Sequence, residues 1–370
     1  AAVVTETVGL SVASHTVTVT ETDATVGDGC NIDLTGVVAL PKTGQTTSFD
    51  VGNVDDGALE IGMPWPTNRF VPNGDGSIRD ELTGLDWLLD ANCAGSLGYD
   101  PDATGDGRLS QDNALAFVED FNTGVVDQTG CNYTGGETDW RLPNVIEMES
   151  LANLEELVQA DWLVSQGFTR VEAERYWSST PFAQQTVTSA VYVDFANASQ
   201  DSSARTATYL AWPVRGGSTG VPVAARANLW EESATPISTA DPGVFWPEPR
   251  FFVHGDGTVT DRLTGLMWLQ DFQCLGIGNW QAALDAVDDF NLPTPSGSYP
   301  CTDYVQGTYA DWRLPNRKEV LSLIDYAVMR PALPPGHPFL GAAPGTAGVF
   351  WTSSVDVAGF NAAWAHQLTA

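Results

Sequence analysis

Apolar residues recur every three or four positions in two separate stretches, one in each half of the chain. Such spacing lines one face of an α-helix, so each stretch predicts an amphipathic helix packed on a core. The apolar positions are Leu115, Val118 and Phe121 in the first helix and Trp280, Leu284, Val287 and Phe290 in the second.

A second helix is predicted in each half, directly after a Leu-Pro pair. Asn144 stands three residues before Glu147, and Asn316 stands three residues before Glu319. This spacing is typical of a capping box, in which the two side chains satisfy the free N–H groups at a helix start. The positions expected to face the core are Leu151 and Leu154 in one copy and Val320, Leu323 and Ile324 in the other.

Strand patterns surround these helices. Valine and threonine alternate within residues 5–20, and further strand-forming segments lie at residues 190–195 and 208–214. β-branched and aromatic residues favour strands. Because short strands and helices are mixed rather than alternating in parallel units, the sequence predicts an α+β fold.

The hexapeptide Asp-Trp-Arg-Leu-Pro-Asn occurs twice, at residues 139–144 and 311–316. A longer framework recurs around it, so one module is used twice. The other repeated elements are Trp65-Pro66 with Trp246-Pro247, Arg69-Phe70 with Arg250-Phe251, Leu-Thr-Gly-Leu at residues 82–85 and 263–266, and Trp177 with Trp351.

The repeat divides the chain into four parts. We expect a β-strand extension over residues 1–38, a first module over 39–217, a linker over 218–227 and a second module over 228–370. The strand-forming end of the first module has no counterpart in the second. The second module is therefore expected to lack its closing strand.

The charge of the chain narrows the classes of function. It carries 47 acidic and 16 basic residues, a formal net charge of -31 at pH 7. Nucleic acids and anionic membranes attract lysine and arginine, so cations are expected partners and nucleic acids are not. No run of 18 apolar residues exists, so membrane insertion is not expected. We interpret the Ala-Ala start as a mature N-terminus left by signal peptidase, which predicts a secreted, extracellular or cell-surface protein.

The five cysteines support export. Cys93 and Cys274 occupy matching places in the two modules, and Cys131 and Cys301 each precede the repeated hexapeptide. One disulfide per module is therefore predicted, Cys93–Cys131 and Cys274–Cys301. A zinc site is the alternative, but none of the four histidines lies near these cysteines in the sequence. Cys30 is left as a buried thiol or a link to another chain.

The order of the motifs resembles the Lcl C-terminal domain family. The motifs are Leu-Pro-Lys-Thr-Gly at residues 40–44, Gly-Asp-Gly-Ser at 74–77, Leu-Thr-Gly-Leu-Asp-Trp at 82–87, the hexapeptide at 139–144, Tyr-Trp-Ser-Ser-Thr at 176–180 and Val-Arg-Gly-Gly at 214–217. The resemblance covers both modules but not residues 1–38. It implies two tandem domains of C-type-lectin-like fold, occurrence in secreted and surface proteins of microbes, and no defined catalytic residues.

Residues 102–113, in the first module only, resemble a calcium loop of the EF-hand or dockerin type. The oxygen ligands would come from Asp102, Thr104, Asp106, the Arg108 carbonyl and Ser110. Asn113 stands where such loops carry an acid, and Asp112 or Asp100 could substitute for it. We expect one bound Ca²⁺; the alternative is an acidic surface turn without metal.

The spacing of the two modules supports the calcium hypothesis independently. From Cys93 to Asn122 is 29 residues, whereas from Cys274 to Asn291 is 17. The difference of 12 residues is the length of one calcium loop.

Arg141 and Arg313 lie between Trp and Leu in the hexapeptide. A charge in that setting requires a partner, so we predict structural ion pairs with the repeated acids Asp80 and Asp261. An anion site is the alternative.

Together these features predict a non-enzymatic structural or adhesive protein. The strand-forming residues 1–38 of one copy are expected to complete the second module of a neighbour, which builds a head-to-tail filament stabilised by disulfides and calcium. The alternatives are pairing of that strand within its own chain, a monomeric protein that binds a glycan or a cell-surface receptor, and a formylglycine-generating-like enzyme.

Overall fold

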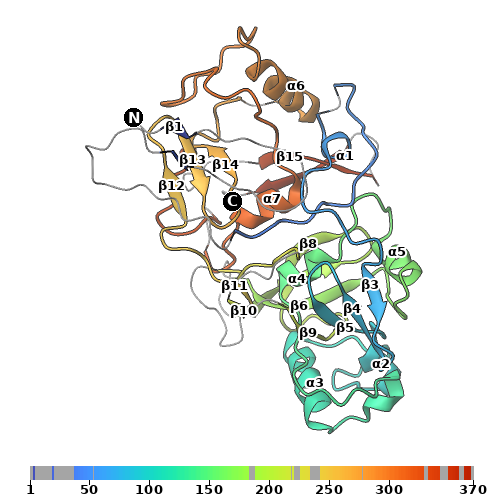
Figure 1. The fold of residues 1–370 in the computed structure, drawn as a ribbon. Coiled ribbons are helices and arrows are strands. Elements are labelled where there is room, and N and C mark those ends of the chain that lie inside the picture. Colours follow the sequence, from blue (N-terminus) through green and yellow to red (C-terminus); the bar gives the residue numbers. More distant parts are fainter. Residues whose placement is uncertain are drawn as a thin grey trace.

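The structure is a computed structural model that describes most of both modules. The described residues are 3–4, 19–20, 37–52, 54–182, 188–217, 219–220, 226–233, 242–276, 278–328, 332–341, 349–357 and 362–367. Most of the predicted extension, including Cys30, lies outside them; within it, β1 (Val3–Val4) pairs antiparallel with β2 (Val19–Thr20). The modules form two lobes of helices and small, mainly antiparallel sheets (Figure 1), which confirms the α+β prediction.

Module one has a four-stranded antiparallel sheet. β3 (Phe70–Pro72), β4 (Ser77–Asp80) and β5 (Leu85–Leu88) are consecutive, and β9 (Val214–Gly216) pairs with the outer edge of β5. The turn between β3 and β4 requires Gly76, because its φ is +91° and a Cβ there would lie 2.1 Å from the backbone oxygen of Asn132.

Module two repeats the first three strands of this sheet. They are β12 (Phe251–Val253), β13 (Thr258–Asp261) and β14 (Met267–Leu269). Val259 faces Trp268 across β13 and β14, as Ile78 faces Trp87 across β4 and β5. Among the described residues, no strand pairs with the outer edge of β14.

Each module also has a second antiparallel sheet. Its strands are β6 (Arg175–Pro181), β7 (Ser189–Asp194) and β8 (Ser199–Ala204) in module one, and β15 (Val349–Asp356) and β16 (Ala362–Gln367) in module two. The strand predicted over residues 190–195 falls on β7. The strand predicted over 208–214 is wrong up to β9, because only isolated bridges at Tyr209 and Leu210 form before Pro213, which has no N–H to donate.

The four predicted helices are confirmed. They are α3 (Gln111–Thr123) and α4 (Val145–Ser150) in module one, and α6 (Trp280–Phe290) and α7 (Arg317–Leu323) in module two. Both capping boxes are present at Asn144 and Asn316. Leu115 was expected to face the core but is 39% exposed, because α3 buries the neighbouring stripe Ala114, Phe117, Val118 and Phe121 instead.

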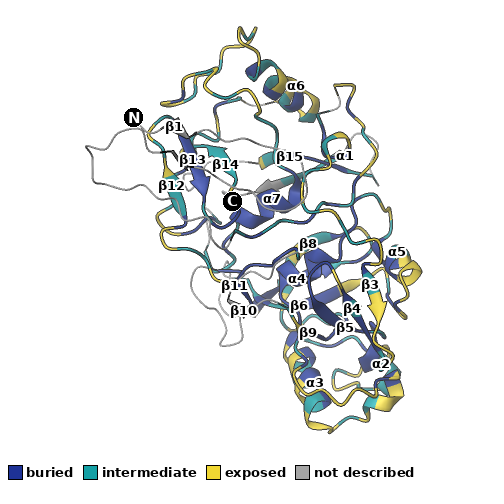
Figure 2. Cartoon of the chain, viewed as in Figure 1, coloured by how far each residue is buried: buried dark blue, intermediate teal, exposed yellow. Residues whose placement is uncertain are grey.

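Short elements complete the modules, and the larger core lies in module one. The elements are α1 (Asp56–Leu59), α2 (Cys93–Leu97), the 3₁₀ turn η1 (Gln128–Cys131), α5 (Gln159–Ser165), β10 (Thr219–Gly220) and β11 (Gly243–Val244). Figure 2 shows β4 and β5 almost wholly buried, and the fully buried indoles of Trp87 and Trp212 lie edge to face. No helix among the described residues has the length and apolar character needed to cross a membrane.

A buried arginine–aspartate pair ties each module together. The Arg69 guanidinium donates twice to Asp80, at 2.9 Å, and once to the carbonyl of Ser150, the last residue of α4. Asp80 also accepts from Leu82 N and the Thr83 hydroxyl, so it fixes the turn after β4. Arg69 lies against the rings of Trp65 and Phe70. The pair therefore joins the first sheet to α4.

Module two repeats this arrangement residue for residue. Arg250 donates to Asp261 and to the carbonyl of Ser322, and its guanidinium lies over Trp246 and Phe251. The repeated Trp-Pro, Arg-Phe and Leu-Thr-Gly-Leu motifs are therefore explained by one buried ion pair in each module.

The predicted partners of the hexapeptide arginines are wrong. Arg141 pairs with Glu147 and Arg313 with Glu319, not with Asp80 and Asp261. Each of these glutamates is the N3 residue of a capping box, so the arginine holds the helix start from outside. Asp80 and Asp261 are already saturated by the arginines that precede β3 and β12.

The residues at the start of each module contact the opposite module. We define leading segment one as the described residues of 37–63 and leading segment two as residues 226–233 and 242–244. In Figure 1, α1 of leading segment one lies beside β15 of module two, and β11 of leading segment two lies beside module one. Leading segments therefore lie between the modules and contact both.

The crossing contacts are reciprocal. Val38 N donates to Leu263 O at 2.7 Å, and the matching Ala227 N donates to Leu82 O at 2.8 Å. The amide of Asn316 donates to Ile61 O, and that of Asn144 donates to Pro242 O. Such reciprocity is the signature of a two-fold interface, here formed inside one chain.

Replacing Arg69 by Met should lower the free energy of unfolding by about 3–5 kcal/mol, because Asp80 would remain buried without its cation. The matched control is Arg79→Met on β4, where the Arg79–Asp86 pair is partly exposed and the loss should stay below about 1 kcal/mol. Urea unfolding of both variants measures the difference. Equal losses would show that the buried pair has no special role.

Candidate functional site

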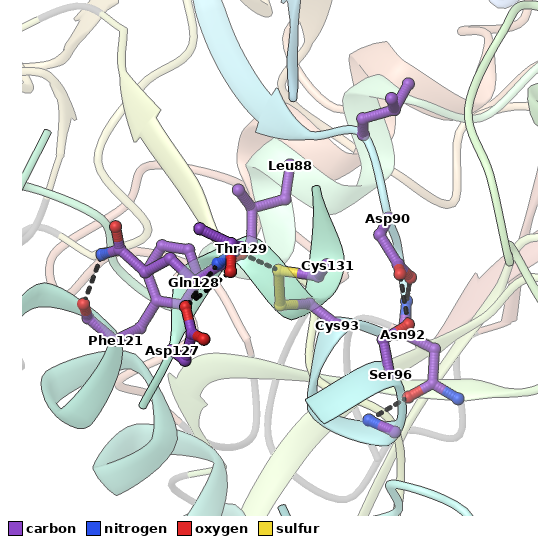
Figure 3. Close-up of a disulfide and its surroundings, with 12 residues drawn as sticks. Leu88, Asp90, Asn92, Cys93, Ser96, Phe121, Asp127, Gln128, Thr129 and Cys131 are labelled. Atoms are coloured by element: carbon purple, nitrogen blue, oxygen red, sulfur yellow. Dashed lines mark hydrogen bonds between the residues drawn. A yellow bond between two sulfur atoms is a disulfide. The ribbon is translucent and has the colours of Figure 1, made fainter. Parts of the chain in front are cut away.

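Both predicted disulfides are present, and in module one the bond joins two short helices. Cys93 is the first residue of α2, and Cys131 is the last residue of η1; their Cα atoms are 5.2 Å apart. Figure 3 shows the bond between Asn92, which caps α2 by accepting from Gly95 N, and the Asp127–Thr129 turn that starts η1. Cys274–Cys301 forms the equivalent bond in module two.

Residues 102–113, the predicted calcium loop, form a glycine-containing turn that leads into a helix. Gly105 and Gly107, its fourth and sixth positions, have φ angles of +75° and +82°. Helix α3 begins at the tenth position with Ser110 as its N-cap residue. The eighth position, Leu109, is fully buried and forms a β-bridge with Tyr209. The two glycines therefore bend the chain, and Leu109 anchors it to the core just before α3 begins.

The residues of the predicted ligand set are hydrogen-bonded to one another in two groups. Asp102 accepts from Ser110 N, and Asn113 also donates to it; these bonds outweigh the effect of burial and lower the pKa of Asp102. Thr104 donates to the Arg108 carbonyl at 2.8 Å, and Asp106 accepts from Arg108 N. The first, ninth and twelfth positions therefore meet, as do the third, fifth and seventh.

Other contacts of the loop differ from the calcium prediction. Asp112, the proposed substitute for the twelfth ligand, pairs with Arg205 outside the loop, and Arg108 pairs with Asp106 and Glu174. Asp100 accepts from Thr104 N and Gly105 N, so it shapes the first turn. Within the described part of the chain, no three His, Cys, Asp or Glu side chains form a cluster that could hold a metal ion.

A buried cluster of charges joins the two modules and was missed by the sequence analysis. Arg317 of module two donates to the Glu149 carboxylate of module one at 2.8 Å, and Lys318 donates to the Glu149 carbonyl at 2.8 Å. Gln200 donates to the same carboxylate, and Trp364 stacks on the Arg317 guanidinium at 4.0 Å. The side chains of Glu149, Arg317 and Lys318 are at most 5% exposed.

The charges of this cluster do not balance. One carboxylate faces two cations, and the loss of water around the ammonium lowers the pKa of Lys318 to about 8, although Glu149 opposes the shift. The two cations in turn outweigh burial and lower the pKa of Glu149. Folding therefore keeps two cations and one carboxylate in close contact between the modules, with Asp56 as a further acid that acts on Lys318.

A departure from the repeat could have revealed this cluster. Arg317 and Lys318 stand where module one has Val145 and Ile146, because both pairs directly follow the capping asparagine. All four residues are buried. A basic pair that replaces an apolar pair at a buried repeat position indicates a partner outside the module.

A second set of carboxylates crosses between the modules. Ser354 on β15 donates to Asp56 of leading segment one at 2.6 Å and accepts from the first N–H of α7. Thr180 on β6 makes the same bridge between Glu232 of leading segment two and the first N–H of α4. The start of α7 thus depends on Asp56 of leading segment one, and the start of α4 depends on Glu232 of leading segment two.

The outer edge of β14 also distinguishes module two from module one, because no described strand pairs with it. Its counterpart β5 is fully buried and pairs with β9, whereas Met267, Trp268 and Leu269 are all partly exposed. The Leu88 N–H, which points to β9, bonds to Pro213 O at 3.2 Å. The equivalent edge of module two pairs with no strand of the described part of the chain, and its side chains are apolar.

The titration of Lys318 gives a pH test of the charge cluster. The unfolded lysine has a pKa near 10.4, so the unfolded chain binds more protons than the folded one between about pH 8 and 10. The unfolding free energy of the wild type, relative to Lys318→Met, should therefore rise with pH over this range by up to about 1.4 kcal/mol per unit and stay flat below about pH 8.

Urea unfolding of both proteins at pH 7, 8, 9 and 10 measures this slope. Lys42→Met, which removes a lysine from the exposed pair with Glu60, is the control for loss of a lysine as such. If the unfolding free energies of the wild type and of Lys318→Met change with pH in parallel, the lowered pKa of Lys318 in the folded protein is contradicted.

Comparison with known proteins agrees with the repeated geometry. The model of the family described as Lcl C-terminal domain matches residues 76–215 and again residues 257–370. No curated protein matches the chain. The two matched regions contain the disulfide, the capping box and the buried aspartate of each module. The chain therefore belongs to the Lcl C-terminal domain family and carries two of its modules in tandem.

Proposed function

We propose that this chain is a non-enzymatic, extracellular structural or adhesive protein, and that its copies join head to tail by β-strand donation. The observation that carries the proposal is the outer edge of β14, which has no partner strand among the described residues. We further propose that each module has the C-type-lectin-like fold that its motifs suggest.

The use of the repeated polar residues supports a structural rather than a catalytic role. Arg69 and Arg250 join a sheet to a helix, and Arg141 and Arg313 hold helix starts. The four paired cysteines form disulfides, which suit an oxidising exterior. The repeated arginines and cysteines thus stabilise the fold of each module. We therefore assign function to the surfaces and strand edges at which the two modules differ.

Strand addition is the chemistry that the β14 edge favours. An added strand would satisfy the edge N–H and C=O groups and cover Met267 and Leu269, as β9 covers β5. If the strand comes from a neighbour, the two contacting surfaces are different, and such heterologous contacts build open filaments.

Calcium is the proposed cation of module one. Asp102, Thr104, Asp106, the Arg108 carbonyl and Ser110 would supply oxygens, and the two positive-φ glycines already give the loop its path. Binding would draw Asp106 away from Arg108, and the weak twelfth position predicts an affinity of roughly 0.1–1 mM, as in extracellular modules.

Calorimetry tests the calcium proposal directly. Wild type should bind one Ca²⁺ and melt at a higher temperature in 5 mM calcium, because ligand binding stabilises only the folded state. Asp102→Asn should lose both effects. The matched control is Asp289→Asn, near the C-terminal end of α6 in module two. This variant should keep the binding heat and the rise in melting temperature. Absence of binding heat in the wild type would end the proposal.

Electron microscopy and light scattering test the assembly. Concentrated wild-type protein in millimolar calcium should form filaments, and a variant that starts at Val37 should remain single, because it lacks the donor strand. A monodisperse wild type, or filaments from the shortened chain, would contradict strand donation.

One observation favours binding of a glycan or receptor as a second candidate function. A surface hollow of about 610 Å³ lies beside Cys131 in module one. Its lining residues include Asp127, Gln128, Thr129, Tyr133 and Thr134. Polar side chains around a shallow hollow suit the hydroxyls of a sugar. A glycan array probed in calcium, with Thr129→Val as the comparison, would separate this role from assembly.

A further inference from the structure

Residues 132–134 of module one, Asn-Tyr-Thr, have the acceptor sequence for N-linked glycosylation, in which Asn is followed by any residue but proline and then by Ser or Thr. A second such sequence, Asn-Ala-Ser, occupies residues 197–199. Because motifs this short also arise by chance, the surroundings of each asparagine in the fold must distinguish a site of modification from a coincidence.

Asn132 is exposed at a place that both of its neighbours hold fixed. Cys131 before it forms the disulfide with Cys93, and Tyr133 after it is buried and packs on the ring of Phe121. Within the described part of the chain, the Asn132 side chain makes no hydrogen bond. A sugar on its amide nitrogen would therefore extend into solvent from a rigid base without breaking a contact that the structure shows.

The asparagine of the second acceptor sequence lies in a turn that contacts module two. Asn197 accepts from Ser199 N at 3.0 Å, so its side chain closes the turn between β7 and β8. Ala198 between them is buried, and its carbonyl accepts from Arg317 of module two. Of the two asparagines, Asn132 is thus the one whose side chain is not already used by the fold.

Module two shows what the fold itself requires at these positions. Asn132 and Asp303 both adopt the left-handed conformation, with φ of +62° and +60°, and each lies between a disulfide cysteine and a tyrosine. Asn and Asp tolerate this conformation better than most side chains. Thr134 corresponds to Val305, and both are exposed. The fold therefore accepts Asp and Val here, whereas module one has the Asn and Thr that glycosylation needs.

The surface hollow of about 610 Å³ in module one lies beside this asparagine. Its lining includes residues 124–129, Tyr133 and Thr134, which stand on either side of Asn132 in the sequence. Val125 within this lining is 71% exposed, so most of its apolar side chain is in water. The C–H faces of a sugar ring suit that valine, and the sugar hydroxyls suit the polar side chains around it.

We propose that Asn132 carries an N-linked oligosaccharide and that the first sugars of this chain cover the hollow. In the transfer, the amide nitrogen of Asn132 attacks the anomeric carbon of an oligosaccharide that a phosphate joins to a lipid carrier. A nitrogen–carbon bond forms, and the bond between the anomeric carbon and the phosphate oxygen breaks. The nitrogen gives up one proton, and the lipid phosphate leaves. The enzyme required is an oligosaccharyltransferase that acts on exported chains.

This inference rests on the proposed extracellular location, because the acceptor sequence is used in secreted proteins. It also bears on the second candidate function. A hollow that is covered by the sugar of its own chain is closed to a soluble glycan, so binding of a partner glycan would fall to another surface.

Mass spectrometry of the full chain, purified from the surface or medium of the cells that produce it, tests the inference. The peptide that contains Asn132 should carry the mass of an oligosaccharide and release sugar fragment ions. Asn132→Asp and Thr134→Val copy the residues of module two, so both variants should fold, and both should lose the glycan. The matched control Asn197→Gln should keep it. Unreduced peptides that contain the Cys93–Cys131 bond show that each variant has folded.

Hydrogen exchange tests the position of the sugar. The amides of residues 124–129 should exchange more slowly in the glycosylated wild type than in Asn132→Asp, and equal rates would overturn the covering of the hollow. If protein recovered outside the cells has its disulfides but no glycan on Asn132, the inference is overturned and the extracellular location stands. If the protein is found only inside the cells, with Cys93 and Cys131 as free thiols, both are overturned.

Discussion

Each module depends on an arginine whose charge has been taken out of water. Arg69 and Arg250 are buried with their aspartates, and each also donates to the last turn of a helix. The guanidinium donates to both oxygens of one aspartate and to one helix carbonyl, a planar fork of donors that a lysine ammonium does not offer. The aromatic residues on either side fill the space around it, so the pair sets where the sheet, the following turn and the helix meet.

The next level of order joins the modules to one another. Each leading segment carries a carboxylate to the opposite module, where a Ser or Thr hydroxyl links it to the first N–H of a buried helix. Burial raises the pKa of Asp56, although the hydroxyls of Ser354 and Thr43 oppose that shift. These contacts make each helix start a shared feature of the pair rather than of one module, so neither module has a complete core by itself.

Local and repeated signals were readable from the sequence. Both capping boxes depend on two residues three apart, and the disulfides followed from cysteines at matching places in two copies. The partner of Asp80 was not readable, because each module repeats two arginines and only the fold shows that Arg69, not Arg141, reaches it. The prediction that Leu115 faces the core was wrong because two apolar stripes overlap on α3. The stripe that contains Ala114 is the one that packs against the core.

The candidate sites also include some features that the sequence predicted and others that only the fold shows. The path of residues 102–113 could be predicted from its glycines and spacing, whereas the pairing of Asp112 with Arg205 depends on the turn after β8, 93 residues away in the chain. The charge cluster between the modules was present in the sequence only as Arg317 and Lys318 in place of an apolar pair. Its meaning required knowing that α4 and α7 face one another across the interface.

That cluster also determines which modules can associate. Two copies of module one, placed face to face, would bring two Glu149 carboxylates together without Arg317 or Lys318, and two copies of module two would bring four of these cations together without Glu149. Only the unlike pair places Glu149 against Arg317 and Lys318. A few side chains that differ between the two modules therefore favour the pairing of module one with module two over the pairing of two identical modules.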